Sequence, residues 1–352
     1  MDENVTALQK ETAVTDMREE IDEIPVAAQR LIDRLSPDLP AIGETLRSRD
    51  SRFVVTVARG SSDHAAAFLK YAIEINTGRA VASVGPSVAS IYGASLSVEN
   101  ALCLAISQSG QSPDIVALQK AASRGGALTV SLTNNADSPL AVQSELSVDV
   151  SAGQERAVAA TKSYVNSVLA GLLLLAAWTR DSVLMDALKR LPKQLEAAVS
   201  LDWSSIHPDI ENGRSLFILG RGPSHAIANE AALKFKETCN LHAEAYSAAE
   251  VLHGPVSLVG GGFPVLALSA RDAAEGAIVE TGERLAADGA AVHITSALND
   301  RARSLPFVDT GHPLTDALAL IVPFYGFVEA LARSLGLDPD RPEKLKKVTE
   351  TT

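Results

Sequence analysis

One strand–turn–helix pattern occurs twice in the chain, and this repeat limits the folds that the chain can adopt. An apolar strand, a glycine turn and the start of a helix follow one another in Val54–His64, and Leu216–His225 repeats that order. Residues 104–134 and 266–299 each read as strand, helix, small residues and strand. Such internal similarity predicts two copies of one α/β unit. Both halves end in a long apolar helical pattern, at residues 161–179 and 314–336.

The apolar runs of the first half indicate parallel sheets. They do not alternate with polar residues, which is typical of strands covered by helices on both faces. We therefore expect an α/β fold of two tandem units, each a mostly parallel sheet with helices on both faces. The expected divisions are a helical segment (1–48), a first unit (49–200), a second unit (201–340) and a C-terminal tail (341–352). The strands expected in the first half are Phe53–Ala58, Ala80–Val84, Leu102–Ile106, Leu128–Leu132 and Leu146–Val150.

Composition and charge restrict the compartment and the partners. The 352 residues carry a formal net charge of −12, so neither nucleic acid nor an anionic membrane is expected as a partner. Only two cysteines occur, which is typical of a reducing compartment. The N-terminus has no signal-peptide pattern, and the longest apolar run, Val168–Trp178, is too short to span a bilayer. We expect a cytoplasmic protein.

A hydroxyl-rich turn, Ser107–Ser112, separates an apolar run from a helix expected at Pro113–Ser123. The backbone N–H groups at a helix start have no partner within the helix, and the helix dipole favours an anion there. This serine turn therefore predicts a phosphate site, although a turn of this composition can also be a capped helix start. The corresponding turn of the second half, Ser269–Asp272, contains an acidic residue that would repel an anion. Only the first copy is expected to bind phosphate.

Titratable side chains concentrate between Glu230 and His253. Glu230, Lys234 and Glu237 are spaced to share one helical face. Such a set can be a solvent-exposed ladder of ion pairs. However, this helix follows a glycine turn and so starts at the carboxyl end of a strand, where open α/β sheets bind ligands. We therefore expect a catalytic site in this segment. His242 and His253 lack metal-ligand spacing, and no metal site is predicted.

Two further segments can each be interpreted in two ways. Small residues in Gly153–Lys162 would let the backbone approach a ligand, and Thr161 could cap the next helix. The same residues can also form a tight connection between a strand and a helix. The segment Lys344–Lys347 has the composition of a solvent-exposed basic tail.

Together these segments resemble the SIS (sugar isomerase) family. The resemblance is to the isomerase half of glucosamine-6-phosphate synthase and to single-chain glucosamine-6-phosphate deaminases, and it runs from about residue 20 to the C-terminus. It implies that each unit is an SIS-type unit. The motifs that carry it, in family order, are Gly60-Ser61-Ser62, Ser107–Gly110, Val158–Lys162, Glu230–Glu237, His242–Ala245 and His253-Gly254-Pro255.

The resemblance also implies roles for individual residues. Glu237 matches the base that moves a proton between C1 and C2 of the sugar, and Lys234 matches a supporting lysine beside it. His253 matches a ring-opening histidine that is reached from the neighbouring subunit of a dimer. Lys347 matches a C-terminal lysine that can form a Schiff base with the open-chain ketose. The residues implied to bind the sugar phosphate are Ser62, Ser107, Gln108, Ser109 and Ser112, with contacts around Val158 and Ala160.

Two departures from the synthase favour the deaminase relatives. The synthase carries an N-terminal glutaminase domain that begins with cysteine, whereas Asp2 follows Met1 here and about 50 residues precede the first expected strand. Ala160 replaces a serine of the synthase pattern. We therefore expect a homodimer with shared active sites that converts glucosamine 6-phosphate and water to fructose 6-phosphate and ammonia, without a metal or redox cofactor. The alternatives are another hexosamine- or fructosamine-phosphate deaminase or deglycase, an ammonia-dependent synthase, and a non-catalytic phosphosugar sensor.

Overall fold

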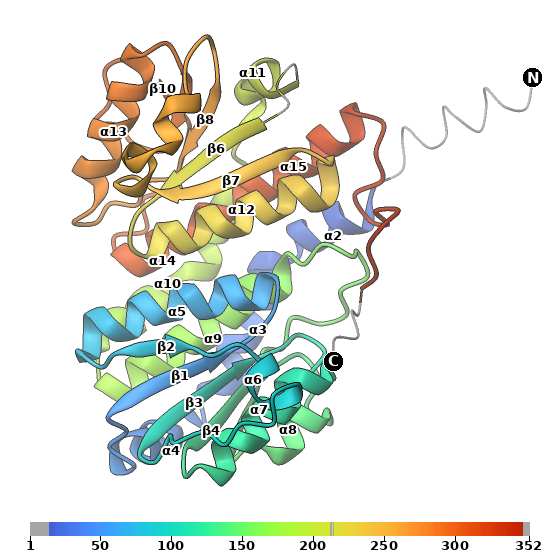
Figure 1. Ribbon diagram of the computed structural model, residues 1–352, viewed down its shortest axis with the longest axis vertical. Coiled ribbons are helices and arrows are strands. Elements are labelled where there is room, and N and C mark those ends of the chain that lie inside the picture. Colours follow the sequence, from blue (N-terminus) through green and yellow to red (C-terminus); the bar gives the residue numbers. More distant parts are fainter. Residues whose placement is uncertain (1–13, 212, 214, 348–352) are drawn as a thin grey trace, which may run out of the picture.

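The computed structural model describes residues 14–211, 213 and 215–347, and two parallel sheets of five strands each organise this part of the chain (Figure 1). The strand orders are β2-β1-β3-β4-β5 in the first sheet and β10-β9-β8-β6-β7 in the second. The α/β fold of two similar units is therefore confirmed. The first sheet comprises β1 (Phe53–Val57), β2 (Val81–Ser83), β3 (Ala101–Ile106), β4 (Leu128–Thr133) and β5 (Leu146–Asp149). The second comprises β6 (Ser215–Gly220), β7 (His242–Ser247), β8 (Pro264–Ala267), β9 (Ala291–Ile294) and β10 (Arg303–Ser304).

Helices cover both faces of each sheet. Those of the first half are α2 (Asp16–Asp22), α3 (Ile24–Leu35), α4 (Leu39–Ser48), α5 (Ser61–Thr77), α6 (Ser87–Ser90), α7 (Pro113–Arg124), α8 (Pro139–Gln143) and α9 (Lys162–Thr179). A connector helix, α10 (Ser182–Val199), leads to the second half. There the helices are α11 (His207–Glu211), α12 (Pro223–Cys239), α13 (Glu275–Ala287), α14 (Pro313–Ala319) and α15 (Ile321–Ser334), with short 3₁₀ turns η1 (Ser204–Ile206), η2 (Glu250–His253) and η3 (Pro255–Leu258).

Successive strand residues enter different cores, as expected for a sheet covered on both faces. Val54 belongs to the core that contains α5 and α9, whereas Val55 belongs to the core under α7 and α8. The register pairs Phe53 with Ala101 and Val57 with Ala105, so β1 and β3 end side by side. The turns that follow these two strands therefore lie next to each other.

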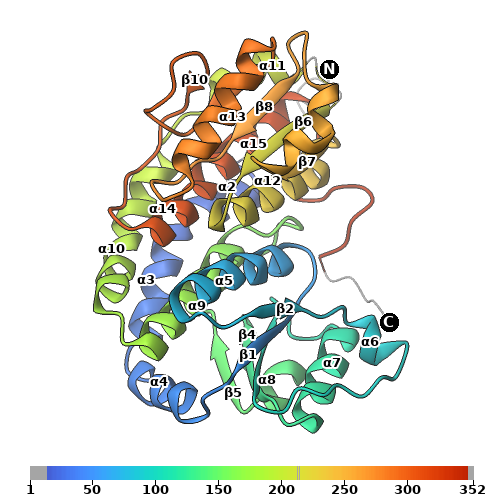
Figure 2. The ribbon, with the colours of Figure 1, turned by 60° about the vertical axis from the view of Figure 1, so that its left-hand side comes forward.

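Helices α5 and α12 join the two halves (Figures 1 and 2). Each begins at a glycine with positive φ, Gly60 (55°) or Gly222 (61°), a conformation that disfavours other residues. Near the start of α5, Ser61 contacts Lys234, which lies toward the end of α12, and His64 contacts Glu230, which lies near its middle. The two helices are therefore antiparallel.

The long apolar helix expected at Leu314–Gly336 is broken in two. Helix α14 ends at Ala319 and α15 begins at Ile321, because Pro323 has no N–H to donate to the carbonyl four residues earlier. The stretch Pro313–Ser334 is long and apolar enough to cross a membrane by length and composition, with a mean hydropathy of 1.6. However, 89% of the 18-residue window that has this hydropathy is buried inside the protein, which is the property of a core helix.

The N-terminal helices hold the connection between β5 and α9. The apolar face of α2 and α3, which includes Met17 and Ile24, is fully buried. Glu20 of α2 is also buried, and its carboxylate accepts hydrogen bonds from the N–H groups of Arg156 and Ala157. Its second oxygen has no partner among the described residues. Burial, opposed by the Arg156 N–H, raises the pKa of Glu20 to about 7.

Close packing between α9 and α5 predicts a strong effect of one added methyl group. A Cβ at Gly171 would lie 2.2 Å from Cδ1 of the buried Leu69. We expect Gly171→Ala to lower the free energy of unfolding by about 1–3 kcal/mol, because the added atom overpacks this contact. In Gly282→Ala, the new Cβ makes only ordinary contacts at 3.6 Å, so the better helix propensity should leave the protein as stable or more stable. Urea unfolding measures both, and equal effects would contradict the packing argument.

The buried Glu20 predicts a pH-dependent stability. Its pKa in the folded protein is about 7, above the ordinary value of 4.5, so its contribution is complete below about pH 4.5 and is lost as the pH rises through about 7. Glu20→Gln keeps the accepting oxygen but cannot ionise. The variant should therefore lack the part of the fall in stability with rising pH that comes from Glu20. Melting temperatures of both proteins between pH 5 and 8 test this, since parallel curves would show that Glu20 does not ionise in that range.

Candidate functional site

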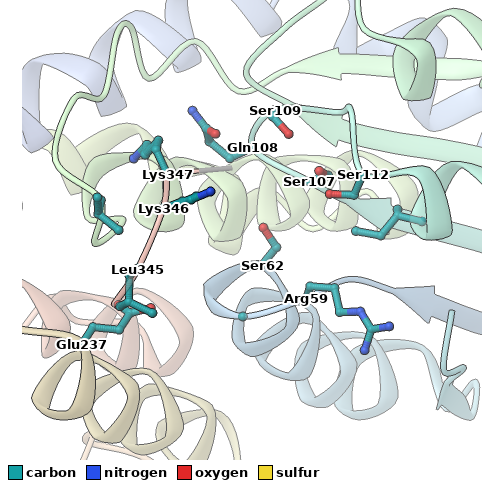
Figure 3. Close-up of a pocket in the computed structure, with 13 residues that line it drawn as sticks. Arg59, Ser62, Ser107, Gln108, Ser109, Ser112, Glu237, Leu345, Lys346 and Lys347 are labelled. Atoms are coloured by element: carbon teal, nitrogen blue, oxygen red, sulfur yellow. The ribbon is translucent and has the colours of Figure 1, made fainter. Parts of the chain in front are cut away.

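A cavity of about 350 Å³ lies between the two halves of the chain (Figure 3). The serine turn after β3 and the turn after β1 form one side of it. The end of α12 and the segment 345–347 form the other side, and Val158 adds the loop before α9. The site residues that the sequence predicts and that line this cavity are Ser62, Ser107, Gln108, Ser109, Ser112, Val158, Glu237 and Lys347.

The serine turn is fixed by its backbone. The Gly110 N–H donates to the Ser107 hydroxyl at 3.2 Å, and the Asn134 N–H donates to the Gln108 carbonyl at 3.0 Å. Gly110 has φ 63°, and a Cβ there would lie 2.1 Å from the Ser138 hydroxyl, so only glycine fits. Ser112 precedes α7 without a side-chain capping bond. Its hydroxyl is therefore available to a ligand at the helix N-terminus, where an anion is favoured.

Arg59 is a cavity residue that the sequence analysis missed. Its guanidinium donates to Asp114 through Nε at 3.1 Å and Nη2 at 2.8 Å. Asp114 is fully buried in the first turn of α7, where its negative charge opposes an anion at the same helix end. The guanidinium offsets that charge. The pairing was not detectable from the sequence, because the two residues lie 55 positions apart.

The charged face of α12 is buried, so the solvent-exposed ladder considered from the sequence is ruled out. The side chains of Glu230 and Lys234 have no exposed surface, and that of Glu237 is 20% exposed. The Lys234 ammonium bonds to the Glu237 carboxylate, lies 3.3 Å from Glu230 Oε1 and donates to the Ser61 hydroxyl at 3.0 Å. Although burial disfavours its charge, the two carboxylates raise the pKa of Lys234 above its ordinary value.

The sequence argument for a site in Glu230–His253 relied on the start of α12, which follows the carboxyl end of a strand of its own sheet. The structure instead brings the end of α12, with Glu237, to the carboxyl edge of the first sheet, because α12 runs antiparallel to α5. The second half thus contributes its charged helix to a site built on the strands of the first half.

His64 is a second residue that the sequence analysis did not assign. Its Nδ1 lies 2.8 Å from Glu230 Oε2, and the Tyr325 hydroxyl donates to Glu230 Oε1 at 3.2 Å. Although burial alone would raise the pKa of Glu230, the Lys234 ammonium and the His64 hydrogen bond hold it below its ordinary value. Glu230 is therefore a buried anion, and its ion pair with Lys234 fixes the position of the lysine amine. The sequence signal that could have pointed to His64 was its position at the end of the repeated segment Val54–His64.

The start of α9 is capped by the Glu155 carboxylate and not by Thr161, which the sequence suggested as the cap. Thr161 precedes α9 but makes no capping bond; instead, Glu155 accepts from the N–H groups of Thr161 and Ser163, both at 3.0 Å. Val158 lines the cavity, and its N–H donates to the Asp340 carbonyl at 2.9 Å. Ala160 is partly exposed but is not among the residues that line the cavity.

Lys347 does not lie in a solvent-exposed tail. Its amine donates to Glu155 at 3.0 Å and to the Ala157 carbonyl at 2.6 Å, which brings the segment 345–347 to the cavity. His253, in contrast, is exposed at the end of η2 and does not line the cavity. Within the single chain, neither His253 nor Ala160 therefore joins the predicted residues that line the cavity.

A backbone donor of the second copy of the turn is occupied from within the chain. The Arg271 N–H donates to Asp316 at 2.8 Å, and the Thr310 N–H donates to the same carboxylate at 3.1 Å. Asp316 is buried, and the Arg271 side chain also lies 2.8 Å from it. The Asp316 carboxylate thus occupies the position at this turn where an anionic ligand would bind. Across residues 14–211, 213 and 215–347, no group of three or more His, Cys, Asp or Glu side chains is placed to hold a metal ion.

Solved structures share this arrangement of two units. A structure assigned to a phosphosugar isomerase of Silicibacter pomeroyi DSS-3 has a TM-score of 0.90 and 56% identity, and the match covers 93% of this chain and 100% of that one. The glucosamine-6-phosphate deaminase of Thermotoga maritima has a TM-score of 0.80 and 21% identity, with 96% and 100% coverage, which shows a common fold.

Sequence comparison places the chain in a family. The glutamine–fructose-6-phosphate aminotransferase of Sulfolobus acidocaldarius is 31% identical, over 99% of this chain and 58% of that protein. The corresponding protein of Symbiobacterium thermophilum is 35% identical, over 85% of this chain and 52% of that protein. The chain thus spans a little over half the length of these curated relatives. The family described as the SIS domain matches residues 48–177 and 209–303. These two matches cover more than half of the chain, which therefore belongs to the SIS domain family.

Proposed function

We propose that this chain converts glucosamine 6-phosphate and water to fructose 6-phosphate and ammonia. The observation that carries the proposal is the cavity in which the serine turn and Glu237 lie on opposite sides. One side offers hydroxyl, amide and backbone donors at a helix N-terminus, which suit a phosphate. The other side offers a carboxylate held by a buried lysine, which suits proton transfer. A phosphorylated sugar placed between them would bind at one end and react at the other.

The relatives support an amino-sugar phosphate as the substrate. The printed names of the Sulfolobus and Symbiobacterium proteins refer to fructose 6-phosphate and to an amino transfer coupled to isomerisation. Deamination is the same sugar chemistry in the opposite direction, with water as the second reactant. We favour it because the segment Val158–Lys162, with Ala160 in place of a serine, resembles the deaminase members of the family.

The proposed mechanism uses Glu237 as the group that moves the proton. In the open-chain sugar, its carboxylate takes the proton from C2, which leaves an enolamine across C1 and C2. The same carboxyl group returns the proton to C1, a proton passes from the amine nitrogen to the C1 oxygen, and the product is an imine at C2 beside a hydroxyl at C1. Water adds to C2, the C–N bond breaks, and ammonia leaves as the ketone forms. The Lys234 ammonium orients the carboxylate and offsets its charge during these steps.

Ring opening is proposed to involve a second copy of the chain. His253 is exposed and does not line the cavity. In this conformation it does not reach a sugar bound in the cavity of its own subunit. The family resemblance assigns this histidine to the site of the neighbouring subunit. We propose a homodimer in which each His253 assists the opening of the pyranose ring in the other subunit.

Measuring ammonia release with a panel of substrates tests the reaction. We expect release from glucosamine 6-phosphate, because one phosphate and one C2 amine satisfy both sides of the cavity. The panel includes galactosamine 6-phosphate, fructosamine 6-phosphate and unphosphorylated glucosamine, the last as the control for the serine turn. Release from fructosamine 6-phosphate alone would replace the proposed reaction with deglycation. Tight binding without any release would indicate a sensor.

A single substitution tests the role of Glu237. Glu237→Gln keeps the shape of the side chain but cannot carry the proton, so kcat should fall roughly 10²–10⁴-fold while the melting temperature changes little. Glu280→Gln removes an exposed carboxylate of α13 and serves as the matched control, with unchanged turnover. A folded Glu237→Gln protein with full activity would refute the proposed mechanism.

A further inference from the structure

Two adjacent lysines of the C-terminal segment point in different directions at the cavity. We call residues 338–347 the C-terminal strap; its Asp340 carbonyl accepts from the Val158 N–H at 2.9 Å. Figure 3 shows the Lys346 amine directed across the cavity toward Ser62 and the serine turn, whereas the Lys347 amine is directed back toward the loop of Val158. The two side chains therefore meet different surroundings.

Lys347 is held by buried partners. Its amine donates to Glu155 and to the Ala157 carbonyl. Burial alone would raise the pKa of Glu155, but the Lys347 ammonium and hydrogen bonds from Ser163 and Thr161 hold it below its ordinary value. The amine is thus fixed between a buried carboxylate and a carbonyl oxygen. In this position the amine ties the strap to the start of α9.

Lys346 is the uncompensated charge of the cavity. Four charged side chains line it, and three of them have partners: Arg59 pairs with Asp114, Glu237 with Lys234, and Lys347 with Glu155. Among the described residues, no hydrogen bond or ion pair engages the amine of the fourth, Lys346. The serine turn itself contributes only neutral donors, and the chain has a net charge of −12. A dianionic phosphate at this turn would gain most from a cation opposite it.

We propose that Lys346 is the charged ligand of the substrate phosphate and that Lys347 anchors the strap. This inference rests on the proposed function for the identity of the ligand. It gives the strap a binding role, because the strap brings a positive charge to a turn whose own donors are neutral. It also assigns the two lysines different tasks, whereas the family resemblance assigned a covalent role to Lys347.

Substitution of each lysine separates these tasks. We expect Lys346→Met to raise KM for glucosamine 6-phosphate roughly tenfold with little change in kcat, because one charge-assisted contact is lost from both ground and transition states. Lys344→Met is the matched control: it removes one positive charge from the same strap at an exposed position outside the cavity, and KM should not change. Equal KM values for the two variants would overturn the role of Lys346.

The role of Lys347 as the anchor of the strap is tested by removing its charge and then restoring it with arginine. Lys347→Met should lower kcat/KM, because the strap is no longer tied to Glu155, and Lys347→Arg should restore most of the activity, because arginine keeps the ion pair. Borohydride reduction during turnover, followed by peptide mass spectrometry, gives an independent readout. A sugar adduct on Lys347, or an inactive Lys347→Arg protein that folds normally, would overturn the anchor.

Calorimetric binding of glucosamine 6-phosphate distinguishes failure of this inference from failure of the proposed reaction. If no ammonia is released by any protein but Lys346→Met still binds the ligand roughly tenfold more weakly than Lys344→Met, the reaction is wrong and the phosphate contact stands. If ammonia is released and both variants bind equally, the reaction stands and the phosphate contact is wrong.

Discussion

The antiparallel packing of α5 against α12 is the contact on which the site depends. It seals Glu230 and Lys234 between the two halves and places Ser61 and His64 of α5 against them. The start of α5 lies at the carboxyl edge of the first sheet, beside the serine turn. The end of α12 is therefore brought to that same edge, and Glu237 with it. Without this packing, the predicted phosphate turn and the predicted base would belong to separate sheets.

The same contact explains why a duplicated fold has a single candidate site. Helices α5 and α12 both have 17 residues, so positions can be matched from their first residues. The positions in α5 that correspond to Glu230, Lys234 and Glu237 are Phe68, Ala72 and Ile75. At the positions that match the charged face of α12, α5 therefore has no charged side chain to offer to the second sheet. The turn of that sheet is also closed by Asp316, so both components of the site are missing there.

Buried charges of this kind are poor evidence for stability. Removing Glu230 and Lys234 from water costs free energy that their attraction to each other and to Glu237 only partly returns. A core built only for stability would have apolar residues at these positions, as α5 has. The buried charges are better explained by what they hold in place, namely a carboxylate at the edge of a cavity large enough for a small phosphorylated molecule.

The sequence predicted local features better than contacts between distant segments. The repeat, the unalternating strands and the serine turn depend on neighbouring residues, and the structure confirms the strands to within two residues at each end. The pairs Arg59–Asp114 and His64–Glu230 depend on how β1, α5 and α12 meet, which periodicity does not show. The break at Leu320 was missed because the apolar pattern continues through Pro323. The expectation for Glu237 relied on the start of α12, whereas the end of this helix reaches the cavity, since the orientation of α12 follows from the packing of the two halves.

The structure of the protein with a bound sugar 6-phosphate tests the central claim most directly. The account predicts a phosphate within hydrogen-bond distance of Ser107, Ser109 and Ser112, with C1 and C2 of the same molecule next to the Glu237 carboxylate. This would show that one ligand spans the two halves. A phosphate bound at another edge of the molecule, or a sugar at the serine turn whose C1 and C2 face away from α12, would contradict it.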